Sequence, residues 1–251
     1  MKTSFIGKYR HQFVRLTSTN DWMMNRLSEE DLVEGTIVIS NHQTKGRGQR
    51  GSSWVSKANE SLTFSILLKP TFVKTTEIFG ISICVALGIF DCLSSFQRGF
   101  KIKWPNDIYF QDKKIAGVLI ENQMSQFVYQ NAVVGIGLNV NQLHFDDLSN
   151  AVSLQQIIGL EFPVEKVMEH ICESLEARYL MLRSGHFKDL KKAYMSNLYG
   201  LNKLQSFIVD NKKLNGKIIN VHRNGFLQIE LTDGKICDYD IKEIKFLSKS
   251  H

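Results

Sequence analysis

The ten residues 45–54, KGRGQRGSSW, place the strongest constraint on what this chain can fold into. Three glycines let the backbone adopt positive φ angles and approach a ligand closely. Their spacing also satisfies G-x-G-x-x-G, but a dinucleotide-binding fold requires a helix to begin at the third glycine. Here the chain continues into residues 61–68, SLTFSILL, which have the composition of a strand. Walker and protein-kinase signatures are also absent, so those nucleotide-binding folds are not predicted.

Three cations alternate with the glycines of this loop: Lys45, Arg47 and Arg50. An arginine side chain presents a planar donor fork with permanent charge, which suits phosphate or carboxylate groups. The loop is therefore predicted to bind an anion. The alternative is a solvated turn whose arginines have no ligand.

Composition is that of a soluble globular protein, with 43% hydrophobic and 22% charged residues in 251. This length suffices for one full domain and a smaller one. The net charge of +6 suits an acidic partner, although scattered lysines also serve solubility. The four cysteines form no CxxC pair, so reduced thiols and a cytoplasmic location are expected. An apolar leader and an uninterrupted apolar span are not found, so we expect neither export nor a membrane.

Hydrophobic periodicity predicts strands and helices in mixed order. Strands are expected at residues 35–40, 61–68, 101–104, 115–121 and 132–140. Helices are expected at residues 21–27, 78–96, 163–182 and 190–197. The first helix follows Ser-Thr-Asn, three residues typical of helix N-caps, whose free amides and hydroxyls could also meet a ligand.

Several polar and glycine residues stand where strands end or pack closely. A Pro-Asn-Asp turn follows one strand and should hold Lys103 and Asp107 rigidly. Gly117 within a strand suggests close approach of a ligand or of backbone. Gly135 and Gly137 alternate along an apolar strand, which suits either a flat ring or close sheet packing.

The sequence pattern changes at residue 203. From there, short predicted strands are joined by Asn-Gly or Asp-Gly at 215–216, 224–225 and 233–234. The last two dipeptides are typical of two-residue hairpin turns. We therefore predict two domains: residues 1–200, and a small β-barrel of residues 201–251 docked on the first.

The order of motifs is more specific than any one of them: Ser-Thr-Asn, Gly-Arg-Gly-x-Arg-Gly-x-x-Trp, Lys-Trp-Pro-Asn-Asp, Lys-Ile-Ala-Gly and Gly-x-Gly-x-Asn. In this order the chain resembles the biotin protein ligases from about Thr17 to its C-terminus. The resemblance implies an α+β fold, with a mixed-sheet catalytic domain of the biotin/lipoate ligase type and a C-terminal SH3-like β-barrel. Some members add an N-terminal DNA-binding domain. About 17 residues precede Ser18 here, so we expect no operator binding.

The resemblance also implies the chemistry. The carboxylate of biotin attacks the α-phosphate of ATP, which releases pyrophosphate and leaves biotinyl-5′-adenylate. A lysine of a biotin carboxyl carrier domain then attacks the activated carbonyl and releases AMP. Both steps place negative charge on phosphate oxygens, where preorganised cations contribute most. Mg²⁺ is expected with ATP, and Asp107 is the nearest candidate ligand. The sequence leaves the oligomeric state open, a homodimer included.

Site residues follow from the same resemblance. The biotin-binding residues would be Ser18, Thr19, Asn20, Gln43, Gly46, Arg47, Gly48, Gln49, Lys114 and Gly117. The ATP- and adenylate-binding residues would be Arg47, Arg50, Trp54, Asn106, Lys114 and Asn139. The catalytic residues would be Arg47, Lys103, Asp107 and Lys114. Many family members have a third arginine where this chain has Gln49, which puts in question how tightly the loop holds the intermediate.

Two other functions are considered. Lipoate and octanoate ligases share the catalytic fold, but they usually carry an Arg-Arg and triple-glycine segment that is absent here. A non-catalytic nucleic-acid binder would need aromatic residues interleaved with Lys and Arg on its surface. The four aromatic residues between 203 and 247 have spacings that suit core positions instead: Phe207, Phe226, Tyr239 and Phe246.

Overall fold

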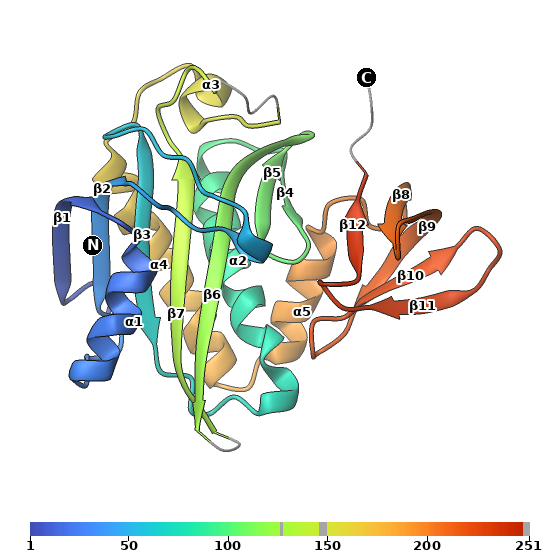
Figure 1. The fold of residues 1–251 in the computed structure, drawn as a ribbon, viewed down its shortest axis with the longest axis horizontal. Coiled ribbons are helices and arrows are strands. Elements are labelled where there is room, and N and C mark those ends of the chain that lie inside the picture. Colours follow the sequence, from blue (N-terminus) through green and yellow to red (C-terminus); the bar gives the residue numbers. More distant parts are fainter. Residues whose placement is uncertain (126–127, 146–149, 248–251) are drawn as a thin grey trace.

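The computed structural model describes residues 1–125, 128–145 and 150–247 (Figure 1). The first strands are β1 (Arg10–Leu16), β2 (Ile37–Gln43), β3 (Ser61–Leu68), β4 (Phe100–Lys103), β5 (Asp107–Phe110), β6 (Lys113–Ser125) and β7 (Val128–Asn139). They form one sheet in the order β1-β2-β3-β7-β6-β5-β4. β1 and β2 pair in parallel, and the other neighbours are antiparallel. This mixed sheet confirms the predicted fold class.

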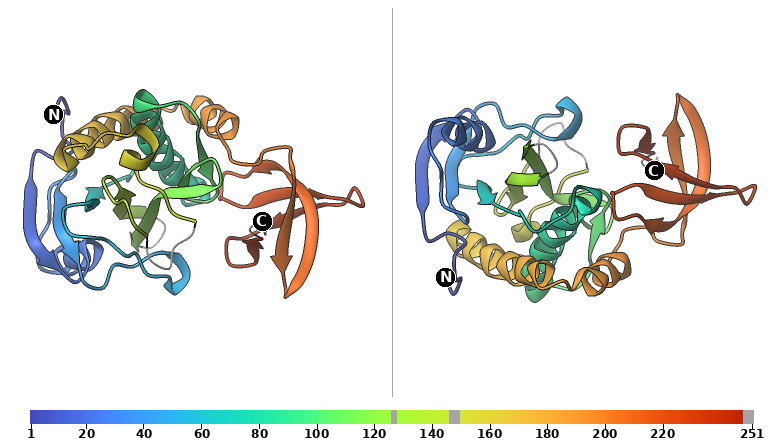
Figure 2. Two further views of the ribbon diagram at one scale, coloured as in Figure 1. Left: turned by 90° about the horizontal axis from the view of Figure 1, so that it is seen from above. Right: turned by 90° about the horizontal axis from the view of Figure 1, so that it is seen from below.

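Helices cover both faces of the sheet (Figures 1 and 2). The helices are α1 (Thr19–Glu29), α2 (Phe79–Phe96), α3 (Leu154–Ile158), α4 (Val164–Arg183) and α5 (Phe187–Ser196), with 3₁₀ turns η1 (Gln49–Gly51) and η2 (Thr75–Glu77). α2 and α4 pack on one face, and α1 packs against β2, β3 and β7 on the other. Every residue of β3 is buried for this reason.

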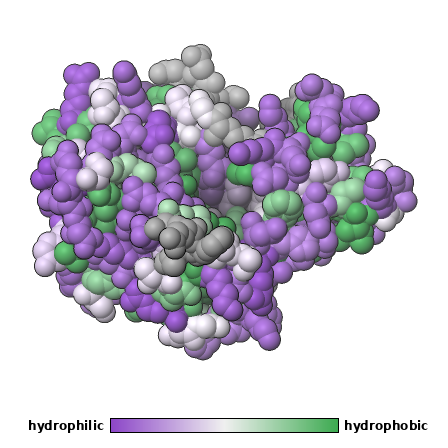
Figure 3. All heavy atoms as spheres, turned by 60° about the horizontal axis from the view of Figure 1, so that its bottom comes forward, coloured by the Kyte–Doolittle hydropathy of each residue, from purple (hydrophilic) through white to green (hydrophobic). Residues whose placement is uncertain are grey.

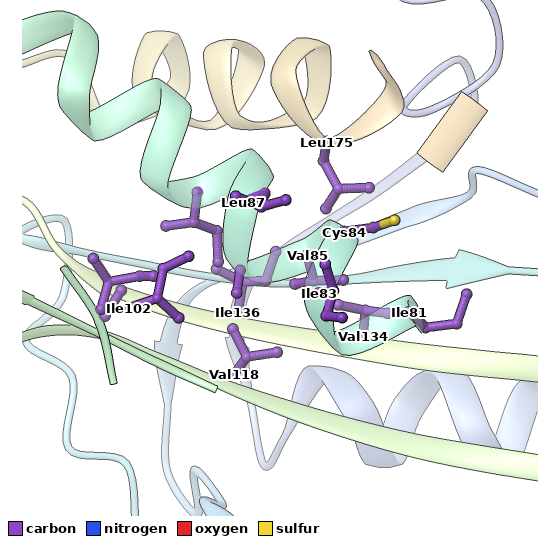
Figure 4. Close-up of a cluster of buried hydrophobic side chains, with 14 of the residues drawn as sticks. Ile81, Ile83, Cys84, Val85, Leu87, Ile102, Val118, Val134, Ile136 and Leu175 are labelled. Atoms are coloured by element: carbon purple, nitrogen blue, oxygen red, sulfur yellow. The ribbon is translucent and has the colours of Figure 1, made fainter. Parts of the chain in front are cut away.

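The core lies between α2, α4 and the sheet. Val134 and Ile136 of β7 meet Ile83 and Leu87 of α2, and Leu175 of α4 closes the other side (Figure 4). The segment Thr75–Phe96 is long and apolar enough to span a membrane, but 67% of its apolar 18-residue stretch is buried in the fold, so it is a core helix. The face of the molecule in Figure 3 is mostly hydrophilic, with hydrophobic residues in small groups.

The N-terminal segment contains a strand that the sequence pattern does not predict. β1 lies at the edge of the sheet, and most of its side chains are exposed. Because such a strand has no buried face, its sequence lacks the apolar alternation from which strands are predicted. The sequence pattern also does not predict the short helix α3, although Ser153 and Gln156 form a capping box at its start.

The C-terminal strands are β8 (Leu204–Val209), β9 (Lys212–Val221), β10 (Leu227–Leu231), β11 (Ile236–Tyr239) and β12 (Ile244–Phe246). They form a five-stranded antiparallel sheet in the order β11-β10-β9-β8-β12. This sheet is consistent with the predicted SH3-like domain. It contacts the larger part at Trp104, whose Nε1 donates to the carbonyl of Gly225 at 2.9 Å. The domain boundary at residue 201 stays a prediction.

One predicted turn is wrong. Asn215 and Gly216 lie inside β9, and the hairpin from β8 turns at Asp210 and Asn211 instead. Both residues have positive φ, 48° and 59°, which a two-residue hairpin turn requires. Asp and Asn tolerate this region better than other non-glycine residues. Turns do lie at 224–225 and 233–234, but each loop has three residues, 223–225 and 232–234, and not the predicted two; Gly225 and Gly234 take the positive φ at the end of each loop.

The cysteines are free, as predicted. Cys84, Cys92 and Cys172 are buried in the core, and Cys237 is half-buried. Burial raises the pKa of the Cys92 and Cys172 thiols to about 12, so both are protonated at neutral pH.

Candidate active site

A cavity of about 330 Å³ lies between the glycine loop, strands β5 to β7 and strand β12 of the small sheet. It brings together most of the residues that the sequence predicts for the site. The predicted residues that line it are Ser18, Thr19, Asn20, Gln43, Arg47, Gly48, Gln49, Trp54, Lys103, Asn106, Asp107, Lys114 and Gly117. Residues from both sheets therefore form one site.

Two predicted residues, Gly46 and Asn139, are not among the described residues that line the cavity, and the side chain of a third, Arg50, is not described. Gly46 lies behind it, where its carbonyl accepts from the Trp54 amide at 2.9 Å. Asn139 is buried at the end of β7, and its Nδ2 donates to the carbonyl of Val152 at 3.2 Å. The backbone of Arg50 belongs to η1, but its side chain lies outside the described residues. The roles of all three in ligand binding stay predictions.

A buried polar cluster forms one end of the cavity. Ser18 caps helix α1, which points the first turn of that helix at the sheet. Gln43 accepts from the Thr19 amide at 2.7 Å and from the Thr19 hydroxyl at 3.1 Å through its Oε1. The Ser65 hydroxyl lies 2.7 Å from Thr19 Oγ1 and 2.6 Å from Asn20 Oδ1. The cluster can present fixed donors and acceptors to a small polar ring.

Arg47 of the loop contacts two carboxylates. Its Nη2 lies 3.0 Å and 2.7 Å from the two oxygens of Glu121 in β6, and 2.5 Å from Oδ1 of Asp21 in α1. The sequence pattern predicts no role for either acidic residue. A glutamate within a strand has no motif of its own, and only the folded structure brings it within reach of residue 47.

A lysine–aspartate pair stands beside Gly117. Lys114 Nζ lies 2.7 Å from Oδ1 of Asp107, and both side chains are only partly exposed. A Cβ on Gly117 would lie 2.9 Å from that Nζ, so a larger residue there would push the end of the Lys114 side chain aside. The close approach predicted at Gly117 is therefore made by the side chain of Lys114. The pairing leaves the ammonium fixed at the cavity wall, where it can hold an anion.

Lys103 is surrounded by aromatic rings. Its Nζ lies 4.4 Å from the ring centroid of Tyr109 and 5.1 Å from that of Phe246, and it hydrogen-bonds the Tyr109 hydroxyl at 3.2 Å. Burial lowers the pKa of Lys103, although the charge of Asp107 opposes this effect. Phe246 comes from β12, so the small sheet takes part in the site. The spacing of Phe246 in the sequence predicts only a core position, and its ring does pack on Phe207, with the ring centroids 5.2 Å apart.

Trp54 forms the wall nearest Gly137. The Nε1 of its indole is buried, and no described residue accepts a hydrogen bond from it. Lys114 Nζ lies 5.8 Å from the ring. A buried donor without a partner costs free energy, which an acceptor on a ligand would recover.

Comparison with known proteins gives the family. The sequence profile of the biotin/lipoate A/B protein ligase family matches residues 12–139. The bifunctional ligase/repressor BirA of Bacillus subtilis is 30% identical over 251 aligned residues, which cover 96% of this chain and 76% of that protein. This chain belongs to the biotin/lipoate A/B protein ligase family. The resemblance read from the motifs is thereby confirmed.

A solved structure and a further relative place this family member among proteins named as biotin ligases. The biotin protein ligase of Aquifex aeolicus, solved with biotin and ATP, has a TM-score of 0.80 and 27% identity. That match covers 96% of this family member and 99% of the Aquifex chain. The biotin acetyl-CoA-carboxylase ligase of Mycobacterium tuberculosis is 28% identical over 176 residues, 67% of this chain and 63% of that protein.

Proposed function

We propose that this family member is a biotin protein ligase, which activates biotin as biotinyl-5′-AMP and transfers it to a lysine of a biotin carboxyl carrier domain. One observation carries the proposal. A single cavity holds a buried polar cluster at one end and the cations Arg47 and Lys114 beside it. That is the arrangement needed to join a polar ring with a carboxylate tail to a phosphate. Likeness over nearly the full length to a ligase solved with biotin and ATP supports it.

In the first half-reaction the ring of biotin lies against Thr19, Asn20 and Gln43, whose positions are fixed by hydrogen bonds with one another and with Ser65. The carboxylate of biotin lies at Lys114. One carboxylate oxygen attacks the α-phosphorus of ATP, the bond to the β-phosphate oxygen breaks, and pyrophosphate leaves. Arg47 and Lys114 stabilise the charge on the phosphate oxygens in the transition state.

The nucleotide base is assigned to the wall formed by Trp54. Magnesium would arrive with the phosphates of ATP, because Mg²⁺ is usually held by one or two carboxylates together with substrate phosphates. Asp107 suits this role because it lines the cavity. The described residues contain no cluster of three or more acidic, histidine or cysteine side chains that could hold a metal ion without the phosphates. Bound there, the ion would neutralise part of the phosphate charge.

In the second half-reaction the amine of the acceptor lysine attacks the carbonyl of the adenylate. An amide bond forms, AMP leaves, and the amine loses a proton. Lys103 on β4 and Asp107 on β5 are opposite each other in the strand register, and both line the cavity. A basic and an acidic group therefore lie side by side where the acceptor lysine would enter. An acetyl-CoA carboxylase carrier domain is the acceptor that fits the names of the relatives.

The test is to incubate the purified protein with ATP, magnesium and equal amounts of biotin, lipoate and octanoate. The small molecules released by denaturation are then identified by mass spectrometry. Biotinyl-adenylate alone is the expected product. Lipoyl- or octanoyl-adenylate would reassign the protein to the other branch of its family, and the absence of any adenylate would reject ligase activity. The second step is tested by adding a carrier domain and measuring by mass spectrometry whether its mass increases by that of one biotinyl group.

A further inference from the structure

The side-chain hydrogen bonds that Arg47 makes with described residues all come from one nitrogen. Both oxygens of Glu121 and one oxygen of Asp21 lie within 3.0 Å of Nη2. No hydrogen bond from Nε or Nη1 to a described residue is found. A guanidinium carries five N–H donors, and two of them belong to Nη2, so the three on Nε and Nη1 stay available for an anion.

The two carboxylates stand behind the guanidinium. Arg47 lines the cavity, whereas Glu121 and Asp21 do not. On β6, Glu121 falls on the same face as Gly117 and Leu119, because side chains alternate along a strand. Both of those residues line the cavity, so Glu121 continues their row just beyond its edge. The carboxylates therefore hold the guanidinium from outside the space where a phosphate would bind.

Glu121 has a second partner in the buried polar cluster. Its Oε2 accepts from Asn20 Nδ2 at 2.8 Å and from Arg47 Nη2 at 2.7 Å. The amide of Asn20 is fixed in turn by Ser65 and by the close approach of Gly135, where a Cβ would lie 2.4 Å from Oδ1 of Asn20. One carboxylate oxygen thus connects the rigid end of the cavity to the glycine loop.

We propose that Glu121 is a positioning residue for adenylate formation: it links Asn20 to Arg47 and aims the loop cation at the α-phosphate, with Asp21 as a second anchor. The proposal rests on the proposed ligase function. Two carboxylates against one guanidinium leave the group with net negative charge, so their contribution is geometry and not additional positive charge. Geometry is decisive here, because a displacement of about 1 Å in a reacting group can cost about a hundredfold in rate.

Glu121→Gln separates this role from a merely structural one. The glutamine keeps an oxygen that accepts from Asn20, but it loses the charge that holds Arg47. We expect the rate of pyrophosphate release with biotin and ATP to fall by about tenfold or more. Because Asn20 keeps its partner, the Kd for biotin alone, measured by calorimetry, should change by less than about threefold. Glu30→Gln is the matched control, because Glu30 also pairs with an arginine, Arg26, but on the exposed side of α1.

A double-mutant cycle shows whether Glu121 acts through Arg47. In an Arg47→Ala background, adding Glu121→Gln should lower the rate by less than about twofold, because the group to be aimed is gone. A further tenfold loss in that background would overturn the proposal. An unchanged or higher rate of pyrophosphate release in Glu121→Gln alone would also overturn it, because the carboxylates would then compete with phosphate for the guanidinium. If the wild-type protein forms no biotinyl-adenylate at all, the ligase function itself fails and this proposal fails with it.

Discussion

The indole of Trp54 occupies the space that a side chain at residue 137 would need: a Cβ on Gly137 would lie 2.3 Å from Cε2 of the ring. Two residues earlier on the same face of β7, Gly135 leaves room for the amide of Asn20. Each glycine therefore admits a side chain from another part of the chain. The flat ring that the glycine pattern accommodates is the protein's own, and the two glycines accommodate two different residues of the cavity wall.

Alanine at the two glycines should separate the two substrates. Gly137→Ala forces the indole from its place, so we expect the Kd for ATP to rise by about tenfold, which is about 1.4 kcal/mol, with a smaller effect on biotin. Gly135→Ala displaces Asn20 and should weaken biotin binding more than ATP binding. Calorimetry with each ligand, together with a melting curve for each variant, measures both effects. Equal losses for both ligands in both variants would show that the glycines serve only the packing of the sheet.

Arg47→Ala should lower the rate of adenylate formation by about a hundredfold or more, as expected for a principal electrostatic donor. The measurement is single-turnover formation of biotinyl-adenylate. Arg26→Ala is its control, since Arg26 forms exposed ion pairs with Glu29 and Glu30 on the same helix that carries Asp21. A loss of less than about tenfold for Arg47→Ala would reject its assignment as the main loop cation.

Removing the ring of Phe246 should change the ionisation of Lys103. Burial is the main cause of the lowered pKa of Lys103, and Phe246 contributes part of that burial from the small sheet. In Phe246→Ala water reaches the ammonium, so the pKa of Lys103 should rise toward the ordinary lysine value of about 10.4. An NMR titration of the Lys103 side chain in wild type and variant shows whether its pKa rises. Phe72→Ala is the control, because the ring of Phe72 is exposed and packs on Tyr179 and Arg183 instead. It should leave the pKa of Lys103 unchanged.

Motif residues of the cavity could be predicted from the sequence because their positions on strand ends and tight loops are local properties. Lys103 and Asp107 stand on either side of one turn, and Arg47 lies within one loop. Glu121 and Ser65 could not be predicted, since their roles depend on contacts across the fold. Glu121 reaches Arg47 across 74 positions of the chain, through the register of β6 and the placement of the loop.

The errors in the fold have the same origin. β1 is stabilised by pairing with β2 and not by a buried face, so its sequence carries no strand pattern. Asn215 and Gly216 have the composition of a hairpin turn but are held in β9 by pairing with β8 on one side and with β10 on the other. Tertiary pairing overrides local turn propensity in that case.

Glu176 binds the N-terminal segment to helix α4. Its carboxylate is buried and accepts from the backbone amides of Ser4, Phe5 and Ile6 at 2.5, 2.9 and 2.8 Å. Burial alone would raise the pKa of Glu176, but these backbone hydrogen bonds outweigh it and hold the pKa below its usual range. The charged carboxylate therefore stabilises the folded state, and a single side chain satisfies the three backbone amides of residues 4–6.

Glu176→Gln should lower the free energy of unfolding by about 2 kcal/mol at pH 7, because hydrogen bonds to a charged acceptor are lost. The folded-state pKa of Glu176 lies below the unfolded value, so its stabilisation is complete above about pH 4.3. It is lost as the pH falls through the folded pKa, and the difference between wild type and variant should shrink over the same interval. Urea unfolding at pH 7, 5, 4 and 3 measures this difference, with Glu165→Gln on the exposed side of α4 as control. If Glu176→Gln lowers the free energy of unfolding as much at pH 3 as at pH 7, the shape of the side chain and not its charge holds the segment.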